Sequence, residues 1–218
     1  MKFMGPLPII GALLAALTAI GAIAWVAWTS IERGQTSEGG ALPATARPAV
    51  SIGGPFQLVD HTGKTVTAAD YRGRFMLIFF GYGYCPDVCP TELATMAAAL
   101  DVLGKRAEKI QPLFISVDPA RDTPKFLADY VANFHPRLVG LTGTADQVAA
   151  AAKAYRVFYA KSKPPEEQPE STAYFMDHSA FVYLMGPDGE YRTMFRRSTS
   201  PKAMAGTIAG ILDQSASK

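Results

Sequence analysis

Cysteine is scarce in this chain of 218 residues, which contains only two. Two cysteines exclude a scaffold held together by several disulfides, and they exclude a four-cysteine zinc or iron–sulfur site within one chain. Charge is scarce as well, because charged residues make up only 18% of the sequence. The formal net charge of +2 and the lack of a Lys/Arg cluster exclude an obvious electrostatic grip on nucleic acid. Hydrophobic residues reach 49%, so the composition is that of a folded chain.

The N-terminal part has almost no charge, and only one charged side chain precedes Glu32. Residues 7–28 are uncharged, and as a helix they would span about 33 Å at about 1.5 Å per residue, enough for a bilayer core. Trp28 closes this run, where aromatic rings favour the membrane interface. A signal peptide cleaved after residues 22–24 is the alternative, but such peptides have a shorter apolar region of about 7–15 residues. We therefore predict a retained membrane anchor over residues 1–31.

The charges around this anchor favour an N-terminus on the inner side of the membrane. Lys2 and the amino terminus lie before the anchor, whereas Glu32 and Arg33 cancel each other after it. No Arg-rich transit peptide precedes the anchor, which favours a bacterial inner membrane, crossed once, with the C-terminal part in the periplasm.

Residues 32–54 are rich in small residues and proline and are interpreted as a flexible tether, and residues 55–214 as the packed domain.

Strand and helix patterns alternate through the packed domain. Thr62-Gly63 between apolar residues predicts a hairpin at its start, and the apolar run 75–80 is typical of a strand buried on both faces. The remaining expected elements are strands at 113–117 and 138–141, helices at 93–103, 124–134 and 144–155, a loop at 161–172, a hairpin of 180–185 with 190–195, and a helix from residue 201. This order predicts an α/β fold: a thioredoxin-like sandwich with an N-terminal hairpin extension, preceded by one transmembrane helix.

The two cysteines, Cys85 and Cys89, lie where the first buried strand gives way to the first helix. A helix N-terminus has free N–H groups and positive potential, which stabilise a thiolate, the form that attacks disulfides and binds metals. A separation of one helical turn lets the two sulfurs converge. A plain structural disulfide and a pair of buried inert thiols are the alternatives; in an oxidising periplasm a reversible disulfide is compatible with function.

Three histidines are possible partners of this pair. His61 lies in the expected hairpin turn and His135 precedes a proline at a helix end, so both are interpreted as structural. His178 lies just ahead of the strand 180–185, in a loop that a thioredoxin-like fold places against the cysteine-bearing helix terminus. Asp177 is a candidate acceptor that orients the His178 imidazole.

Two thiolates and one imidazole form a soft donor set that suits Cu(I) in a three-coordinate site. The same set with an added water would suit catalytic zinc. Ligand type alone therefore leaves both metals open.

Three motifs occur in order along the chain: GYGYCPDVCPTEL at 81–93, SVDPARDTP at 116–124 and DHS at 177–179. Together they closely resemble the SCO/SenC family, whose members are membrane-tethered, thioredoxin-like copper-binding assembly factors for cytochrome c oxidase. The resemblance covers about residues 55–212 and the N-terminal anchor. It implies that Cys85, Cys89 and His178 are the copper ligands, that the ion is Cu(I), and that Cu(II) is a second state to consider.

The resemblance implies a metallochaperone rather than an enzyme. Such a protein would receive copper from a donor and hand it to the copper-carrying subunit of the oxidase, with the membrane as a further partner. The alternative is a thiol–disulfide oxidoreductase that draws on a thiol reductant and reduces the cysteines of the oxidase copper site through the pair Cys85 and Cys89. A peroxidase-like enzyme is disfavoured because the Thr-x-x-Cys pattern is missing before Cys85.

The charged residues Asp118, Arg121 and Asp122 lie between a strand end and a helix cap. We interpret this loop as structural, shaping the rim of the site or a partner surface. Tyr82 and Tyr84 are expected to pack beside the site and limit access of water.

Overall fold

The computed structural model describes residues 51–162 and 174–216. The predicted anchor at 1–31 and most of the predicted tether lie outside this part of the chain. Within the described residues, no helix has both the length and the apolar character needed to cross a membrane.

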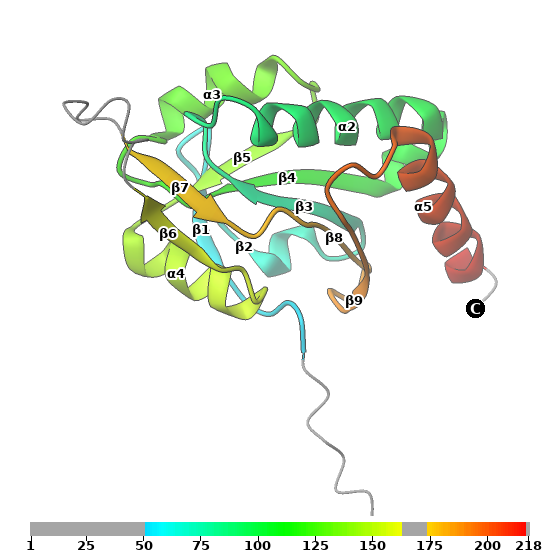
Figure 1. Ribbon diagram of the computed structural model, residues 1–218. Coiled ribbons are helices and arrows are strands. Elements are labelled where there is room, and N and C mark those ends of the chain that lie inside the picture. The colour runs from blue at the N-terminus through cyan, green and yellow to red at the C-terminus, as the bar shows by residue number, and fades with distance from the viewer. Residues whose placement is uncertain (1–50, 163–173, 217–218) are drawn as a thin grey trace, which may run out of the picture. The chain divides into compact units, whose positions relative to one another are not determined.

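A central sheet of seven strands, in the order β2-β1-β5-β4-β3-β8-β9, forms the middle layer (Figure 1). Its innermost strands are parallel neighbours, β3 with β4 and β4 with β5, whereas β8 pairs antiparallel with β3. The strands are β1 (Gln57–Asp60), β2 (Thr65–Thr67), β3 (Phe75–Gly81), β4 (Ile110–Ser116), β5 (Val139–Thr142), β8 (Val182–Met185) and β9 (Tyr191–Phe195).

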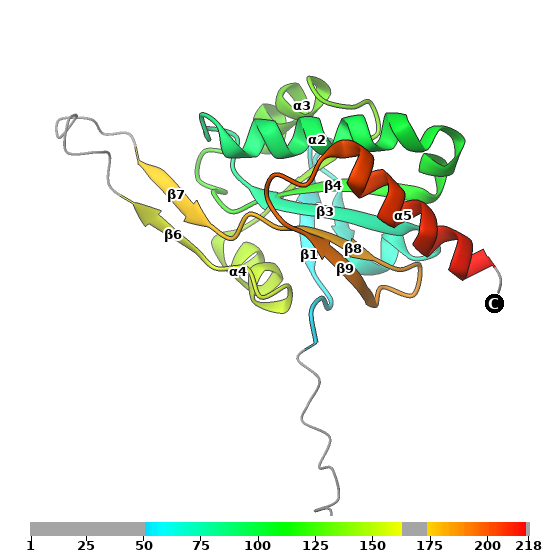
Figure 2. The same cartoon turned by 45° about the vertical axis from the view of Figure 1, so that its right-hand side comes forward.

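Helices cover both faces of this sheet. In both views α2, α3 and α5 lie on one side and α4 on the other (Figures 1 and 2). The helices are α2 (Val88–Leu103), α3 (Pro124–Ala132), α4 (Ala145–Ala154) and α5 (Pro201–Ala216), with short 3-10 helices η1 (Ala68–Tyr71) and η2 (Gly104–Lys109). This is the predicted α/β sandwich, and the hairpin of β1 and β2 is its N-terminal extension.

Local sequence signals fix the helix ends. Gly104 follows α2 with a positive φ of 55°, a conformation that glycine adopts without steric cost. Thr123 caps α3 by accepting a hydrogen bond from the Phe126 N–H. Thr144 and Gln147 form a capping box at the start of α4, within the predicted helix 144–155.

The core is built around β3 and β4, in which every residue is buried. Because helices cover both faces, these strands do not alternate: β3 is apolar throughout, and β4 contains only Gln111 and Ser116 as polar residues. The predicted strand 75–80 is confirmed, whereas the predicted strand 113–117 begins earlier, at Ile110. Helix α2 starts at Val88, within the cysteine motif that was expected to open it, and ends as expected, so Cys89 lies in its first turn.

The predicted loop 161–172 is wrong at its start, where Lys161 and Ser162 belong to a strand. Strand β6 (Tyr159–Ser162) pairs antiparallel with β7 (Phe175–His178), and the two form a separate two-stranded sheet. In Figure 2 this hairpin extends away from the central sheet. The prediction failed because β6 is short and polar at its end, without the apolar alternation by which strands are recognised.

Candidate metal centre

Cys85 and Cys89 lie at the carboxyl end of β3, where the chain turns into α2 (Figure 1). Cys85 is partly exposed and Cys89 is fully buried, and both are free thiols. The Cys89 N–H, one of the free amides of the first helical turn, donates a hydrogen bond to the Cys85 sulfur at 3.4 Å. The helix terminus therefore stabilises negative charge on Cys85, as the sequence predicted.

His178 ends β7 and reaches the cysteine pair from the other side of the site. Its Nε2 lies 3.4 Å from the Cys89 sulfur, although the two residues are 89 positions apart. In zinc sites a thiolate at about 2.3 Å and an imidazole nitrogen at about 2.0 Å from one ion lie about 3.5 Å apart at a tetrahedral angle. The observed sulfur–nitrogen separation therefore fits a shared metal ion.

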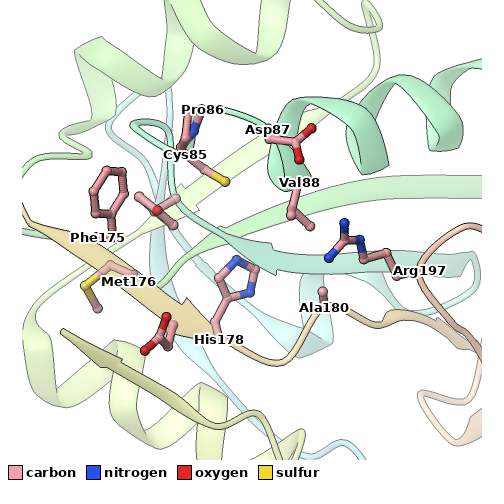
Figure 3. A pocket seen from close by; sticks show the side chains of 11 residues that line it. Cys85, Pro86, Asp87, Val88, Phe175, Met176, His178, Ala180 and Arg197 are labelled. Carbon is pink, nitrogen blue, oxygen red and sulfur yellow. The ribbon is translucent and has the colours of Figure 1, made fainter. Parts of the chain in front are cut away.

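The Cys89 sulfur and the His178 imidazole are in contact, and the Cys85 sulfur lies beside them. Within the described residues, no group of three or more His, Cys, Asp and Glu side chains is spaced to enclose an ion as it stands. Cys85 is the partly exposed member, and its sulfur faces the His178 ring (Figure 3).

Aromatic rings hold the His178 imidazole in place. The Tyr82 ring meets it edge-on, with ring centroids 5.9 Å apart and an angle of 90° between the planes. Phe79 of β3 makes a second edge contact with a centroid distance of 6.0 Å. Tyr82 is buried beside the site, as expected, whereas Tyr84 is half exposed and stacks on Phe126 instead.

The second nitrogen of His178 is oriented by a backbone group. Its Nδ1 lies 3.1 Å from the Ser179 carbonyl oxygen, so a proton on Nδ1 would leave Nε2 free to bind a metal. Asp177, the acceptor suggested by the sequence, has an exposed side chain at the wall of a cavity beside Cys85 and His178, and the contact of Nδ1 is with the Ser179 carbonyl instead. Sequence reasoning cannot find such a carbonyl, because every residue carries one.

The pKa values of the two thiols are shifted in opposite directions. The hydrogen bond from the Cys89 side chain lowers the pKa of Cys85 to about 3, with a further contribution from His178 and against the effect of burial. The same hydrogen bond, together with burial, raises the pKa of Cys89. One proton shared by the pair therefore resides on the buried sulfur, and the accessible sulfur is the thiolate.

A cavity of about 350 Å³ opens beside Cys85 and His178 (Figure 3). Its walls come from the cysteine loop, from β7 and from Arg197, a residue that the sequence analysis did not single out. The lining residues include Tyr82, Pro86, Asp87, Val88, Met176 and Ala180. A partner's side chain can therefore approach the thiolate and the imidazole from solvent.

The other two histidines have structural roles, as predicted. His61 Nδ1 accepts a hydrogen bond from the Gly140 N–H at 3.1 Å and ties β1 to β5. His135 Nδ1 accepts from the Arg137 N–H at 3.1 Å, just after α3.

The fold is an α/β sandwich, and two thiols and an imidazole meet where its central strand leads into a helix. These features define a thioredoxin-like protein suited to thiol or metal chemistry. Comparison with known proteins identifies the family. The SCO1/SenC family model matches residues 44–213, and the chain belongs to this family.

Relatives come from eukaryotes and bacteria. Protein sco1 of Schizosaccharomyces pombe is 38% identical over 208 residues, covering 95% of this chain and 78% of the relative. SenC of Rhodobacter capsulatus is 41% identical over 169 residues, covering 78% of this chain and 74% of the relative. The mitochondrial SCO1 homologue of Homo sapiens is 45% identical over 160 residues, or 72% of this chain, which spans only 52% of that longer protein.

Solved structures share the fold. Yeast Sco1 with copper bound is 42% identical with a TM-score of 0.67, over 75% of this chain and 89% of the yeast chain. BsSco, described as a member of the Sco family of cytochrome c oxidase assembly proteins with a disulfide switch, is 26% identical with a TM-score of 0.56, over 74% of this chain and 92% of that one. The predicted thioredoxin-like domain and the family resemblance are thereby confirmed.

Proposed function

We propose that this protein is a membrane-tethered copper chaperone that binds copper through Cys85, Cys89 and His178 and helps to assemble the copper centre of cytochrome c oxidase. The observation that carries the proposal is the 3.4 Å contact between the Cys89 sulfur and His178 Nε2, with the Cys85 thiolate beside it. Thiolates and imidazole together select Cu(I) over hard divalent ions. Copper bound to yeast Sco1 supports copper over zinc as the cargo.

Delivery would proceed by exchange of ligands. A thiolate of the oxidase subunit enters through the cavity and displaces the accessible donors first, His178 and then Cys85, while the buried Cys89 leaves last. Each displaced sulfur can take up a proton from solvent, and the copper ion keeps its oxidation state throughout. The gradual exchange avoids releasing free copper.

We place the domain in the periplasm of a bacterium, held at the inner membrane by the anchor at residues 1–31. The support is the uncharged run of 7–28, the charge asymmetry around it and the likeness to the bacterial SenC. Copper would arrive from a donor in the same compartment.

A thiol–disulfide oxidoreductase is the second candidate, favoured by the unequal acidity of the two thiols. Cys85, with its pKa lowered to about 3, would attack a partner disulfide, and Cys89 would resolve the mixed disulfide. The products are a reduced partner and an oxidised Cys85–Cys89 pair, which an external dithiol must reduce again. His178 separates the two functions, because disulfide exchange does not need a third metal ligand.

The test is oxidase assembly in cells that lack this protein, supplied with variants of it. Cys85→Ser and Cys89→Ser should each abolish copper insertion into the oxidase and His178→Ala should reduce it strongly, whereas His135→Gln, a histidine away from the site, should restore it. Full assembly with His178→Ala but none with Cys85→Ser would overturn the chaperone function in favour of the oxidoreductase.

A further inference from the structure

Arg121, in the loop after β4, contacts three tyrosines and a buried carboxylate. Its Nε donates to Asp118, which is almost fully buried, and its Nη1 donates to the Tyr174 carbonyl oxygen at 3.0 Å. The guanidinium carbon lies 3.7 Å from the ring centroid of Tyr174, 4.9 Å from that of Tyr84 and 5.7 Å from that of Tyr82. A flat, permanently charged group can stack on such rings and donate in its plane at the same time.

These tyrosines belong to the two segments that carry the candidate ligands. Tyr84 immediately precedes Cys85, and the Tyr82 ring packs edge-on against His178. Tyr174 lies immediately before β7, the strand that ends at His178. One side chain from a third segment therefore contacts both the cysteine loop and the start of the histidine strand.

The histidine strand lies outside the central sheet and is held to the domain by side-chain contacts, among them the buried Met176 and the ring contacts of His178. Strand β7 pairs only with β6, and the two form a sheet separate from the seven-stranded one among the described residues (Figure 2). A two-stranded sheet alone is marginally stable in water. The Tyr174 hydroxyl adds a second tie by donating to Asp118 at 2.7 Å, so Asp118 and Arg121 together secure this end of the hairpin.

The buried position of the Arg121 guanidinium is unfavourable for one of its nitrogen atoms. The Nη2 atom of Arg121 is buried and has no hydrogen-bond partner within the part of the chain that the structure describes. A buried donor left without a partner disfavours the fold. Arg121 cannot itself bind a metal ion, because its guanidinium has no free electron pair.

We propose that Arg121 is a positioning residue for the metal centre: it clamps β7 to the cysteine loop and thereby sets the distance between His178 and the two sulfurs. This inference rests on the proposed function, in which those three side chains bind copper. Loss of the clamp should release the imidazole while leaving the cysteine pair intact, since both cysteines lie on one continuous loop and helix.

The test uses the full-length reduced protein with Arg121→Gln and Arg121→Lys. Lysine keeps the charge beside Asp118 but cannot stack as a plane or bond the Tyr174 carbonyl in the same way. Arg192→Gln is the matched control, because Arg192 also pairs with an aspartate, Asp188, but at the turn between β8 and β9. Cu(II) affinity, nitrogen hyperfine coupling in the Cu(II) spectrum and Cu(I) affinity are measured for each.

Arg121→Gln should weaken Cu(II) binding by about 10–100-fold and diminish the imidazole nitrogen coupling, as loss of an orienting group around a metal site does. Cu(I) binding should fall much less, and Arg121→Lys should be intermediate; if the glutamine variant fails to fold, the lysine variant carries the test. In the double variant with His178→Ala, Arg121→Gln should cause no further loss of copper affinity, because both substitutions act through the same imidazole. Arg192→Gln should match the unaltered protein.

Unchanged nitrogen coupling and affinity in Arg121→Gln, with His178→Ala defective, would overturn the clamp alone. Losses that add in the double variant would also overturn it, because Arg121 would then act apart from His178. Copper binding unaffected by His178→Ala would instead refute the ligand set of the proposed function, and the clamp with it.

Discussion

Cys85 and Cys89 are four residues apart yet lie in opposite environments. Cys85 faces the cavity and accepts a hydrogen bond from the Cys89 N–H, whereas Cys89 is fully buried in the first turn of α2. In the proposed function the accessible sulfur is therefore the one available for first contact with a partner, and the buried one would hold the copper ion longest.

Asp122 stabilises the cysteine loop through a hydrogen bond to its backbone. It is fully buried, and its Oδ2 accepts hydrogen bonds from the Ser116 hydroxyl at 2.6 Å and from the Gly83 N–H at 2.9 Å. Burial raises the pKa of Asp122, and these two hydrogen bonds oppose the rise. The carboxylate thus fixes the backbone two residues ahead of Cys85 while remaining easier to protonate than an exposed aspartate.

This predicts a pH dependence of stability with a definite sign. A carboxyl whose pKa is raised by folding binds more protons in the folded state, so the free energy of unfolding should fall as pH rises from about 4 through the folded pKa. Asp122→Asn should flatten this part of the pH profile, because the amide oxygen can still accept both hydrogen bonds but does not titrate. Urea unfolding between pH 4 and 8 measures the effect.

Asp122→Ala is the companion variant. It leaves the Gly83 N–H and the Ser116 hydroxyl without their acceptor and should cost about 1–3 kcal/mol, with a pH profile as flat as that of Asp122→Asn. Identical pH profiles for Asp122→Asn and the unaltered protein would contradict the assignment.

Single residues differ in how far the sequence predicts them. Cys85, Cys89 and His178 could be singled out because thiols and imidazoles are rare in this chain and occur at a strand–helix junction and in a loop facing it. The Ser179 carbonyl could not, since backbone groups leave no signature. The contact of Arg121 with Tyr174, 53 positions away, depends on tertiary structure and is likewise invisible in the sequence.

At the scale of elements, the end of β3 lies in close contact with the first turn of α2, next to the cysteines. A Cβ atom at Gly81, the last residue of β3, would lie 2.9 Å from the Cys89 sulfur and 2.9 Å from a ring carbon of Phe79. Both neighbours are buried, so neither can move aside freely. Glycine at this position lets the helix start sit directly on the strand end.

Gly81→Ala should therefore lower the free energy of unfolding by about 1–3 kcal/mol through overpacking and also weaken Cu(I) binding by displacing Cys89. Urea unfolding and Cu(I) competition titration test both effects. Gly210→Ala is the matched control: a Cβ there meets no atom within 4 Å, and alanine in an exposed stretch of α5 should stabilise the protein by about 0.5–1 kcal/mol. Unaltered copper affinity in Gly81→Ala would contradict the contact.

Elements were predictable where burial or capping leaves a pattern. The apolar run of β3, the Thr123 cap and the Thr144–Gln147 box all identify their elements correctly. The β6–β7 hairpin was missed because it is short and half exposed, and its strands are stabilised by tertiary contacts instead of by their own alternation. The missed element is the one that carries His178, so this residue could be inferred from the expected topology and from the motif, but not from a predicted strand.

At the scale of the whole molecule, the site exists only when the complete domain is folded. The cysteines come from the junction of β3 and α2, whereas His178 comes from a hairpin outside the central sheet, 89 positions beyond Cys89. Folding thus creates the donor set, and copper binding should in turn stabilise the fold. The central claim is that these distant segments bind one copper ion together.

The most direct measurement is copper binding by the reduced full-length protein, in both oxidation states, with and without His178→Ala. The unaltered protein should bind one ion per chain. In His178→Ala two thiolates remain, so Cu(I) should bind more weakly but still bind, whereas Cu(II), which requires more nitrogen and oxygen donors, should be lost almost completely. His178→Ala with the affinity of the unaltered protein for both Cu(I) and Cu(II) would contradict the account, because the imidazole would then not be a ligand.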